Sequence, residues 1–341
     1  MAIFYKLSVK EIKQETKKAV SILFEVPEDI KQEFCFIPGQ YITIMKELAG
    51  EEIRRAYSIC SSKESNSIRI GITGVPGVGK STFIESFGKL ITSLNKKLAV
   101  LAIDPSSQRS KGSILGDKTR MSTLAVDPLA YIRPSASGNS LGGVSTKTRE
   151  TMLLCEAAGF EIIFIETVGV GQSETTVKGM VDFFLLLMLA GAGDELQGIK
   201  KGIMEMADTI AITKADGDNK APCDRACREY KNALHLFPPT ESGWYPKVLT
   251  CSAVTKEGLG SIWEVIKDFK KDMSEKNFFI RNRQYQNVQW MHDIIFYSLK
   301  QKFYSNQSIS NSIQSLEKEI RNSQIPAISA ARNLLQQYYN S

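Results

Sequence analysis

The sequence has no apolar run long enough to cross a bilayer, and few of the residues that build disulfides or metal clusters. Its longest apolar run, residues 183–193, falls well short of the roughly 20 residues that a spanning helix needs. The first residues lack the apolar core of a secretory signal. Six cysteines and two histidines are scattered over 341 residues, which is typical of a reducing environment. We therefore expect a cytoplasmic protein with no membrane span.

The sequence also lacks a strong charge of one sign. The formal net charge is +6, and the basic residues form neither an arginine-rich block nor a basic stripe interleaved with aromatics. Nothing in this distribution favours nucleic acid as a partner. The apolar fraction of 43% is ordinary for a globular chain, and the length allows two or three domains.

The centre of the chain carries a phosphate-binding motif. Residues 68–73 form a short apolar run, and the following residues have the P-loop pattern Gly-x-x-x-x-Gly-Lys-Ser between a predicted strand and a predicted helix. Backbone amides of such a loop turn towards phosphate oxygens, Lys80 reaches the β/γ-phosphates, and the Ser81 hydroxyl can bind Mg²⁺. The predicted phosphate-binding residues are Gly74, Val75, Pro76, Gly77, Val78, Gly79, Lys80, Ser81 and Thr82.

Strands and helices then alternate, which predicts an α/β fold with a mostly parallel sheet. Apolar runs at 98–103, 160–165, 183–189, 209–213 and 248–251 indicate buried strands, and 147–158 indicates a helix. Ligands of such sheets lie outside the carboxyl ends of the strands. Asp104 and Glu166 stand at two of these ends, and Asp117 is a third candidate ligand of Mg²⁺. A carboxylate at a strand end can instead cap a helix.

A second motif selects the base. Residues 213–216 read Thr-Lys-Ala-Asp after a predicted strand and fit the guanine-binding pattern Asn/Thr-Lys-x-Asp. Asp216 can accept hydrogen bonds from guanine N1–H and the exocyclic amine, and the stem of Lys214 can cover the purine. A backbone amide of Ser252, Ala253 or Val254, after the last strand, can meet guanine O6. These residues favour GTP over ATP.

Five strings resemble the MeaB/ArgK-type GTPases: residues 74–82, 101–107, 112–121, 166–174 and 191–202. The resemblance covers about residue 68 to the C-terminus. It implies GTP hydrolysis coupled to protecting and loading an adenosylcobalamin-dependent acyl-CoA mutase, chiefly methylmalonyl-CoA mutase. It also implies that the segments 112–121, 166–174 and 191–202 are switches that report the nucleotide state to the mutase.

The same resemblance assigns roles by position. It implies catalytic roles for Lys80, Asp104 and Glu166, and a Mg²⁺ site made of Ser81, Asp104, Asp117 and Glu166. Two residues differ from the usual sequence of the family. Thr213 replaces the commoner Asn of the guanine motif, and Ala190 stands where proline is usual. The residue that orients the attacking water stays open between Gln172 and Asp117. A charge-stabilising finger stays open among Lys200, Arg120 and Arg149, each of which can equally be a solvated surface charge.

The C-terminal part, residues 273–341, is predicted to be helical. Residues 288, 291, 295 and 299 form an apolar stripe that 290, 294 and 297 widen. So broad a face must be covered, either by helices at about 311–322 and 327–339 or by a second chain. The resemblance favours a helical dimerisation arm and therefore a homodimer.

The first 67 residues depart from that family, which normally opens with helices. Alternating residues at 20–26, 41–45 and 53–59 predict an antiparallel β unit. The strings at 38–41 and 55–58 resemble the FAD-binding barrel of ferredoxin-reductase-type oxidoreductases, close to the reductase of phenylacetyl-CoA oxygenases. The resemblance stops near residue 67, because the strand at 68–73 must feed the P-loop and cannot also close a barrel. We expect a chimera in which a truncated barrel (1–67), which we do not expect to bind FAD, precedes the GTPase domain (68–272).

Two other functions remain open. One is a GTPase that inserts nickel or another metal, against which the scarcity of Cys and His argues. The other is a flavin-linked electron-transfer module that acts through the N-terminal segment.

Overall fold

The structure of the chain is a computed structural model. It describes residues 4–16, 19–34, 41–48, 50–58, 67–104, 121–136, 141–167, 173–191, 201–237, 240 and 242–340. Within these residues, no helix combines the length and the apolar character that crossing a membrane requires.

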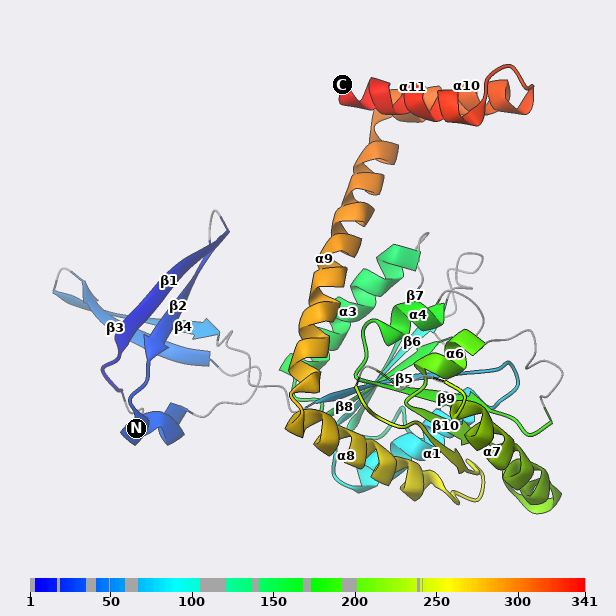
Figure 1. The fold of residues 1–341 in the computed structure, drawn as a ribbon. Helices are drawn as coiled ribbons and strands as arrows, with labels where there is room; N and C mark the ends of the chain where they lie inside the picture. The colour runs from blue at the N-terminus through cyan, green and yellow to red at the C-terminus, as the bar shows by residue number, and fades with distance from the viewer. Residues whose placement is uncertain are drawn as a thin grey trace.

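A seven-stranded parallel sheet forms the centre of the molecule (Figure 1), in the strand order β11-β10-β9-β5-β8-β6-β7. The predicted α/β fold with a parallel sheet is therefore confirmed. Its central strands are buried on both faces, which is why they are continuous apolar runs in the sequence. In chain order the strands are β5 (Ile68–Gly74), β6 (Leu98–Asp104), β7 (Ala130–Ala136), β8 (Ile162–Thr167), β9 (Phe183–Met188), β10 (Thr209–Ile212) and β11 (Lys247–Thr250).

Helices cover both faces of the sheet. Alternate strand residues such as Ile70 and Phe164 belong to a core shared with α1 and α8, and their neighbours such as Ile163 and Phe184 belong to a core shared with α3. The helices around the sheet are α1 (Lys80–Ser93), α3 (Leu141–Ala157), α4 (Ser173–Lys178), α6 (Lys201–Met206), α7 (Lys220–Leu234) and α8 (Leu259–Glu275), with the short 3-10 helix η4 (Gly217–Asn219) before α7.

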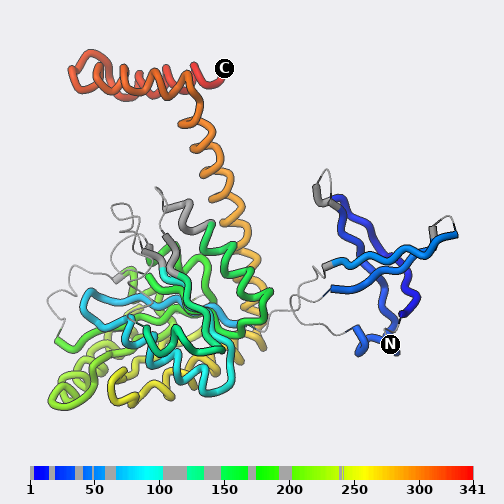
Figure 2. The backbone as a smooth tube through the Cα atoms, turned by 180° about the vertical axis from the view of Figure 1, so that it is seen from behind, coloured from blue at the N-terminus to red at the C-terminus, as the bar shows by residue number. Residues whose placement is uncertain are grey.

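The N-terminal segment forms two separate antiparallel hairpins, drawn apart from the parallel sheet (Figure 2). β1 (Ser8–Thr16) pairs with β2 (Ala19–Glu25), and β3 (Tyr41–Leu48) pairs with β4 (Glu51–Ser58); the 3-10 helix η1 (Glu28–Phe34) lies between them. The predicted antiparallel strands are present. None of the residues whose burial is described between 4 and 57 is buried, so the hairpins enclose no core of their own.

A long helix, α9 (Phe278–Ser305), leaves the sheet and ends at a pair of helices, α10 (Gln307–Arg321) and α11 (Ala327–Tyr339), which lie across its far end (Figure 1). The ring centroids of Phe303 and Tyr338 are 5.2 Å apart at this junction. The predicted apolar stripe stays open, because the exposed fractions of Val288, Met291, Ile295 and Leu299 lie between 45% and 55%. Helices α10 and α11, one of the two alternatives for covering this stripe, therefore do not cover it.

Candidate functional site

The P-loop connects the end of β5 to the start of α1, as the motif predicts. A side chain at Gly74 would place its Cβ 2.6 Å from the carbonyl oxygen of Leu187, so only glycine lets β5 approach β9 here. Gly79 has a φ of 83°, a left-handed conformation that turns the chain into α1. The loop thus presents its backbone to the start of a 14-residue helix, whose N-terminus favours anions.

Lys80 lies at the carboxyl edge of the sheet. Its ammonium nitrogen Nζ donates a hydrogen bond of 2.5 Å to the carbonyl oxygen of Thr167, at the end of β8. Burial lowers the pKa of Lys80 below its ordinary value, while the nearby carboxylates of Glu166 and Glu174 oppose that shift. An incoming phosphate would favour the charged ammonium in the same way as these carboxylates.

The predicted metal ligands come together only in part within the described residues. Ser81 follows Lys80 in the first turn of α1, and Glu166 lies on β8 in register with Ile72 of β5 and Ala102 of β6. Asp104 ends β6 at the same edge, but its side chain lies outside the described part of the structure, as does the whole of Asp117. A hydroxyl and a carboxylate beside a phosphate loop are the hard oxygen donors that suit Mg²⁺ with its nucleotide.

The guanine motif is assembled from the ends of β10 and β11. The hydroxyl of Ser252 donates a hydrogen bond to the Asp216 carboxylate and accepts from the backbone amides of Val254 and Thr255, at 3.2 and 3.1 Å. This fixes the carboxylate that would read guanine N1–H. The loop is also held to the P-loop helix, because the hydroxyl of Ser86 donates to the Ala253 carbonyl at 2.7 Å. The Lys214 stem lies near Gly79, as a side chain covering the purine requires.

Thr213 ties the two motifs together. Its buried hydroxyl donates a hydrogen bond of 2.9 Å to the carbonyl oxygen of Val78 in the P-loop. The threonine that stands where asparagine is commoner therefore links the base-binding loop directly to the phosphate-binding loop.

Replacing Thr213 by valine is expected to lower the free energy of unfolding by about 1–3 kcal/mol, because the shape is kept while the buried carbonyl of Val78 loses its donor. Chemical denaturation of the nucleotide-free protein measures this change, and calorimetry should show weaker GTP binding. Thr43→Val, at an exposed position on β3, is the matched control and should alter neither quantity. An unfolding curve of Thr213→Val that matches the wild type would contradict the link.

The comparisons with known proteins agree with this geometry. The sequence profile of the family described as "Methylmalonyl Co-A mutase-associated GTPase MeaB" matches residues 42–308. GTPase ArgK of Escherichia coli is 53% identical over 226 residues, which are 66% of this chain and 68% of that protein. The chain belongs to the MeaB family of GTPases. It is a GTP-hydrolysing enzyme, and the family binds GTP or GDP together with Mg²⁺.

Two further relatives extend the match. The mouse protein named "Methylmalonic aciduria type A homolog, mitochondrial" is 43% identical over 302 residues, which cover 87% of this chain and 73% of that protein. The crystal structure of a protein titled "LAO/AO transport system kinase" superposes with a TM-score of 0.61 at 38% identity and covers 81% of this chain and 82% of that chain.

The MeaB match changes the interpretation of the N-terminal segment. The profile begins at residue 42, within the part that the sequence assigned to a flavin reductase, and the comparisons do not support that resemblance or the chimera. Arg55 and Tyr57, which carried the resemblance, are exposed on β4, and the strands form two two-stranded sheets in place of one barrel. The strings at 38–40 and the side chain of Ser58 lie outside the described residues.

One candidate charge-stabilising finger is placed elsewhere. Arg149 is 5% exposed on α3, and its guanidinium donates to the carbonyl oxygens of Gln286 and Gly179, at 3.0 Å each. These contacts point the side chain towards α9, so the structure contradicts a finger role. The other candidates, Lys200 and Arg120, and both candidates for the water-orienting residue, Gln172 and Asp117, lie outside the described residues.

Sequence reasoning missed two features of the Lys80 environment. Glu174 is almost fully buried at the start of α4 and acts electrostatically on Lys80, although the sequence placed it only within a switch segment. The acceptor for Lys80 is the backbone carbonyl of Thr167, whose hydroxyl donates to that of Thr73 at 2.7 Å. A carbonyl contact leaves no signal in the sequence, whereas the acidic residue eight positions after Glu166 could have been noticed.

Proposed function

We propose that this GTPase protects, loads or reactivates an adenosylcobalamin-dependent acyl-CoA mutase of the methylmalonyl-CoA mutase type. The observation that carries the proposal is membership of the mutase-associated MeaB family over residues 42–308, supported by the name of the mouse relative. We place this activity in the cytoplasm. GTP is held by residues 74–82, Lys214, Asp216 and 252–254, with Mg²⁺ on Ser81, Asp104, Asp117 and Glu166.

In this proposal, catalysis depends on positioning and charge neutralisation. Phosphoryl transfer requires little covalent chemistry from the protein. Lys80 exchanges its Thr167 carbonyl for phosphate oxygens, while the P-loop amides and Ser81 orient the β/γ-phosphates. Bound Mg²⁺ supplies further neutralisation of the phosphate charge. Asp104 and Glu166 hold that ion directly or through water.

The switch segments are the route by which we expect the mutase to sense the nucleotide. β8 ends at Thr167 before the segment that leads into α4, and β9 ends at Met188 before the segment that leads into α6. Both strands end at the carboxyl edge of the sheet, where the P-loop also begins. A partner that contacts the chain at this edge would therefore lie close to the bound phosphates.

We further propose that the chain has three parts: the N-terminal segment 1–67, a GTPase domain at 68–272 and a C-terminal arm at 273–341 that contains α9, α10 and α11. We propose that the chain acts as a homodimer through this arm. The half-exposed apolar stripe of α9 supports a covered interface, because apolar surface of this kind is unusual on an isolated helix. Light scattering on the purified protein measures the mass and should give twice that of one chain.

Adding an adenosylcobalamin-dependent mutase is expected to change the rate of GTP hydrolysis, because a partner that binds one nucleotide state better must shift the balance between states. Phosphate release is measured with the GTPase alone, with the mutase, and with an unrelated acyl-CoA enzyme as control. An unchanged rate together with no co-elution of the two proteins would contradict the chaperone role and leave the GTPase itself standing.

No observation favours the two alternatives. Within the described residues, no cluster of three or more His, Cys, Asp or Glu side chains is placed to hold a metal ion. The absence of FAD binding stays a prediction, which a flavin absorbance band in the purified protein would contradict.

A further inference from the structure

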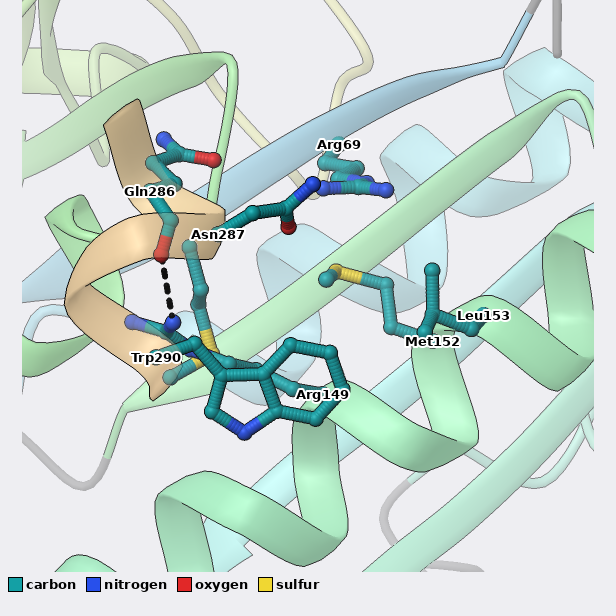
Figure 3. A pocket seen from close by; sticks show the side chains of 8 residues that line it. Arg69, Arg149, Met152, Leu153, Gln286, Asn287 and Trp290 are labelled. Atoms are coloured by element: carbon teal, nitrogen blue, oxygen red, sulfur yellow. Dashed lines mark hydrogen bonds between the residues drawn. The ribbon is translucent and has the colours of Figure 1, made fainter. Parts of the chain in front are cut away.

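A buried arginine joins three elements of the fold on the side of the sheet that carries α3, α4 and α9. Arg149 lies on α3, and its two terminal nitrogens donate to the carbonyl oxygen of Gly179, just after α4, and to that of Gln286, within α9. The guanidinium lies beneath the Gln286 carbonyl and beside the Trp290 indole (Figure 3), with its central carbon 5.9 Å from the centre of that ring. One side chain therefore contacts both the residue that follows α4 and the first third of the arm helix.

Helix α4, at one end of this contact, lies close to the P-loop lysine. Lys80 holds the Thr167 carbonyl at the end of β8, and α4 begins six residues later at Ser173. Glu174, in the first turn of α4, is buried and acts on the Lys80 ammonium. When Lys80 leaves Thr167 for a phosphate, its interactions with the end of β8 and with Glu174 of α4 both change.

The α9 end is anchored separately to the sheet. Arg283 of α9 donates to both carboxylate oxygens of Asp182, at 2.8 and 2.6 Å, and Gln286 donates its amide to the Val181 carbonyl at 2.8 Å. Asp182 and Val181 directly precede β9, so these contacts hold the base of α9 to the rigid sheet and do not involve α4. Arg149 is the contact that adds α4 to this anchor.

Space is available for α4 to move. Thr175 and Lys178 of α4 face Tyr285 and Gln289 of α9 across a cavity of about 550 Å³, so these faces are not packed together. The Arg149 Nε atom has no hydrogen-bond partner within the described part of the structure, although the residue is almost fully buried. The guanidinium therefore has a donor that a second arrangement of its neighbours could use.

We propose that Arg149 couples the nucleotide state to the arm: its bridge between the Gly179 and Gln286 carbonyls makes the packing of α9 against the end of α4 depend on whether Lys80 holds Thr167 or a phosphate. The inference extends the proposed function, since the arm is the part proposed to dimerise. Its test involves neither the mutase nor the dimer, so its failure would be distinct from failure of the chaperone proposal.

Trp290 provides the readout, because its ring rests against the Arg149 guanidinium. Fluorescence of the full chain is recorded with GDP and with a non-hydrolysable GTP analogue. The chain has three tryptophans, and comparison with Trp290→Phe gives the part of the emission that comes from Trp290. In the wild type, the Trp290 emission is expected to differ between the two nucleotides. In Arg149→Met the difference is lost, while GTP hydrolysis persists because Lys80, Ser81 and Glu166 are untouched.

A second variant and a control keep the result interpretable. Arg149→Lys retains a buried cation but has one ammonium that cannot span both carbonyls, so it should lose the difference even where Arg149→Met fails to fold. In either variant the ratio of analogue to GDP affinity should shift by about 2- to 30-fold. Lys147→Met, two positions away on an exposed part of α3, should behave as wild type. A wild-type emission that ignores the nucleotide, or an Arg149→Lys protein that keeps the wild-type response, would overturn the coupling.

Discussion

Lys80→Ala is expected to lower kcat for GTP by at least about a hundredfold, because it removes a preorganised charge from the position where the β/γ-phosphates bind. The ammonium already lies at the carboxyl edge of the sheet, 2.5 Å from the Thr167 carbonyl. Burial holds its pKa below the ordinary value, so part of the cost of desolvating this charge is met by folding. Steady-state release of phosphate at saturating GTP measures the effect.

The matched control for this substitution is Lys267→Ala, which makes the same chemical change on an exposed part of α8 where the lysine pairs with Glu264. It should leave kcat unchanged. Circular dichroism and thermal unfolding show whether Lys80→Ala is folded. Near-wild-type hydrolysis by a folded Lys80→Ala protein would contradict the role given to the P-loop lysine.

Asp216→Ala is expected to weaken GTP binding by at least about a hundredfold, because two hydrogen bonds to a carboxylate are lost and each contributes about 1.5–3 kcal/mol. Ser252 and the amides that it accepts from hold the carboxylate in place, so little reorganisation is needed when guanine binds. Calorimetric titration with GTP measures the change. The weak affinity for ATP should be unaffected, because adenine presents neither donor to Asp216.

Asp218→Ala is the control for this second substitution, since Asp218 lies two positions further on in η4 and is exposed. Its GTP affinity should match that of the wild type. Equal loss of GTP affinity in both variants would indicate a general effect of negative charge near the site, and would contradict base recognition by Asp216.

The sequence predicted the centre of the sheet well because buried parallel strands leave a clear pattern. β5, β8 and β9 are covered on both faces and therefore contain long apolar runs. β7 (Ala130–Ala136) was missed because it is an edge strand that contains Arg133 and Pro134, and of its residues with described burial only Ile132 is buried. β1 was missed because its charged, exposed residues show no apolar face.

Some residues of the candidate site could likewise be predicted from the sequence, and others could not. The P-loop (74–82) and the Thr-Lys-Ala-Asp motif (213–216) are each contiguous in sequence, so their residues could be named in advance. The structure links them to each other and to residues 252–254 through Thr213 and Ser86. Arg149 was misjudged because a charged residue in a helix is usually exposed, and only the approach of α9 buries it. Contacts between elements far apart in the chain are set by packing and have no local signature.

In the N-terminal segment, the sequence suggested a family resemblance that the comparisons do not support. Short sequence segments such as those at 38–41 and 55–58 can match a family by chance. The strands β3 and β4, which contain Tyr41 and residues 55–58, form a hairpin without a core of buried residues. The MeaB profile instead begins at residue 42. Strand periodicity was a sound guide to local structure here, whereas it carried no information about which strands pair into one sheet.

We expect the edge formed by β5, β8, β10 and β11 to bind and hydrolyse GTP through the P-loop and the guanine motif. Parallel measurement of GTP and ATP turnover by the purified wild-type protein, with and without Mg²⁺, tests this expectation. Hydrolysis of GTP should depend on magnesium and should greatly exceed hydrolysis of ATP. Equal turnover of the two nucleotides, or turnover of ATP alone, would contradict the assignment of this site to GTP.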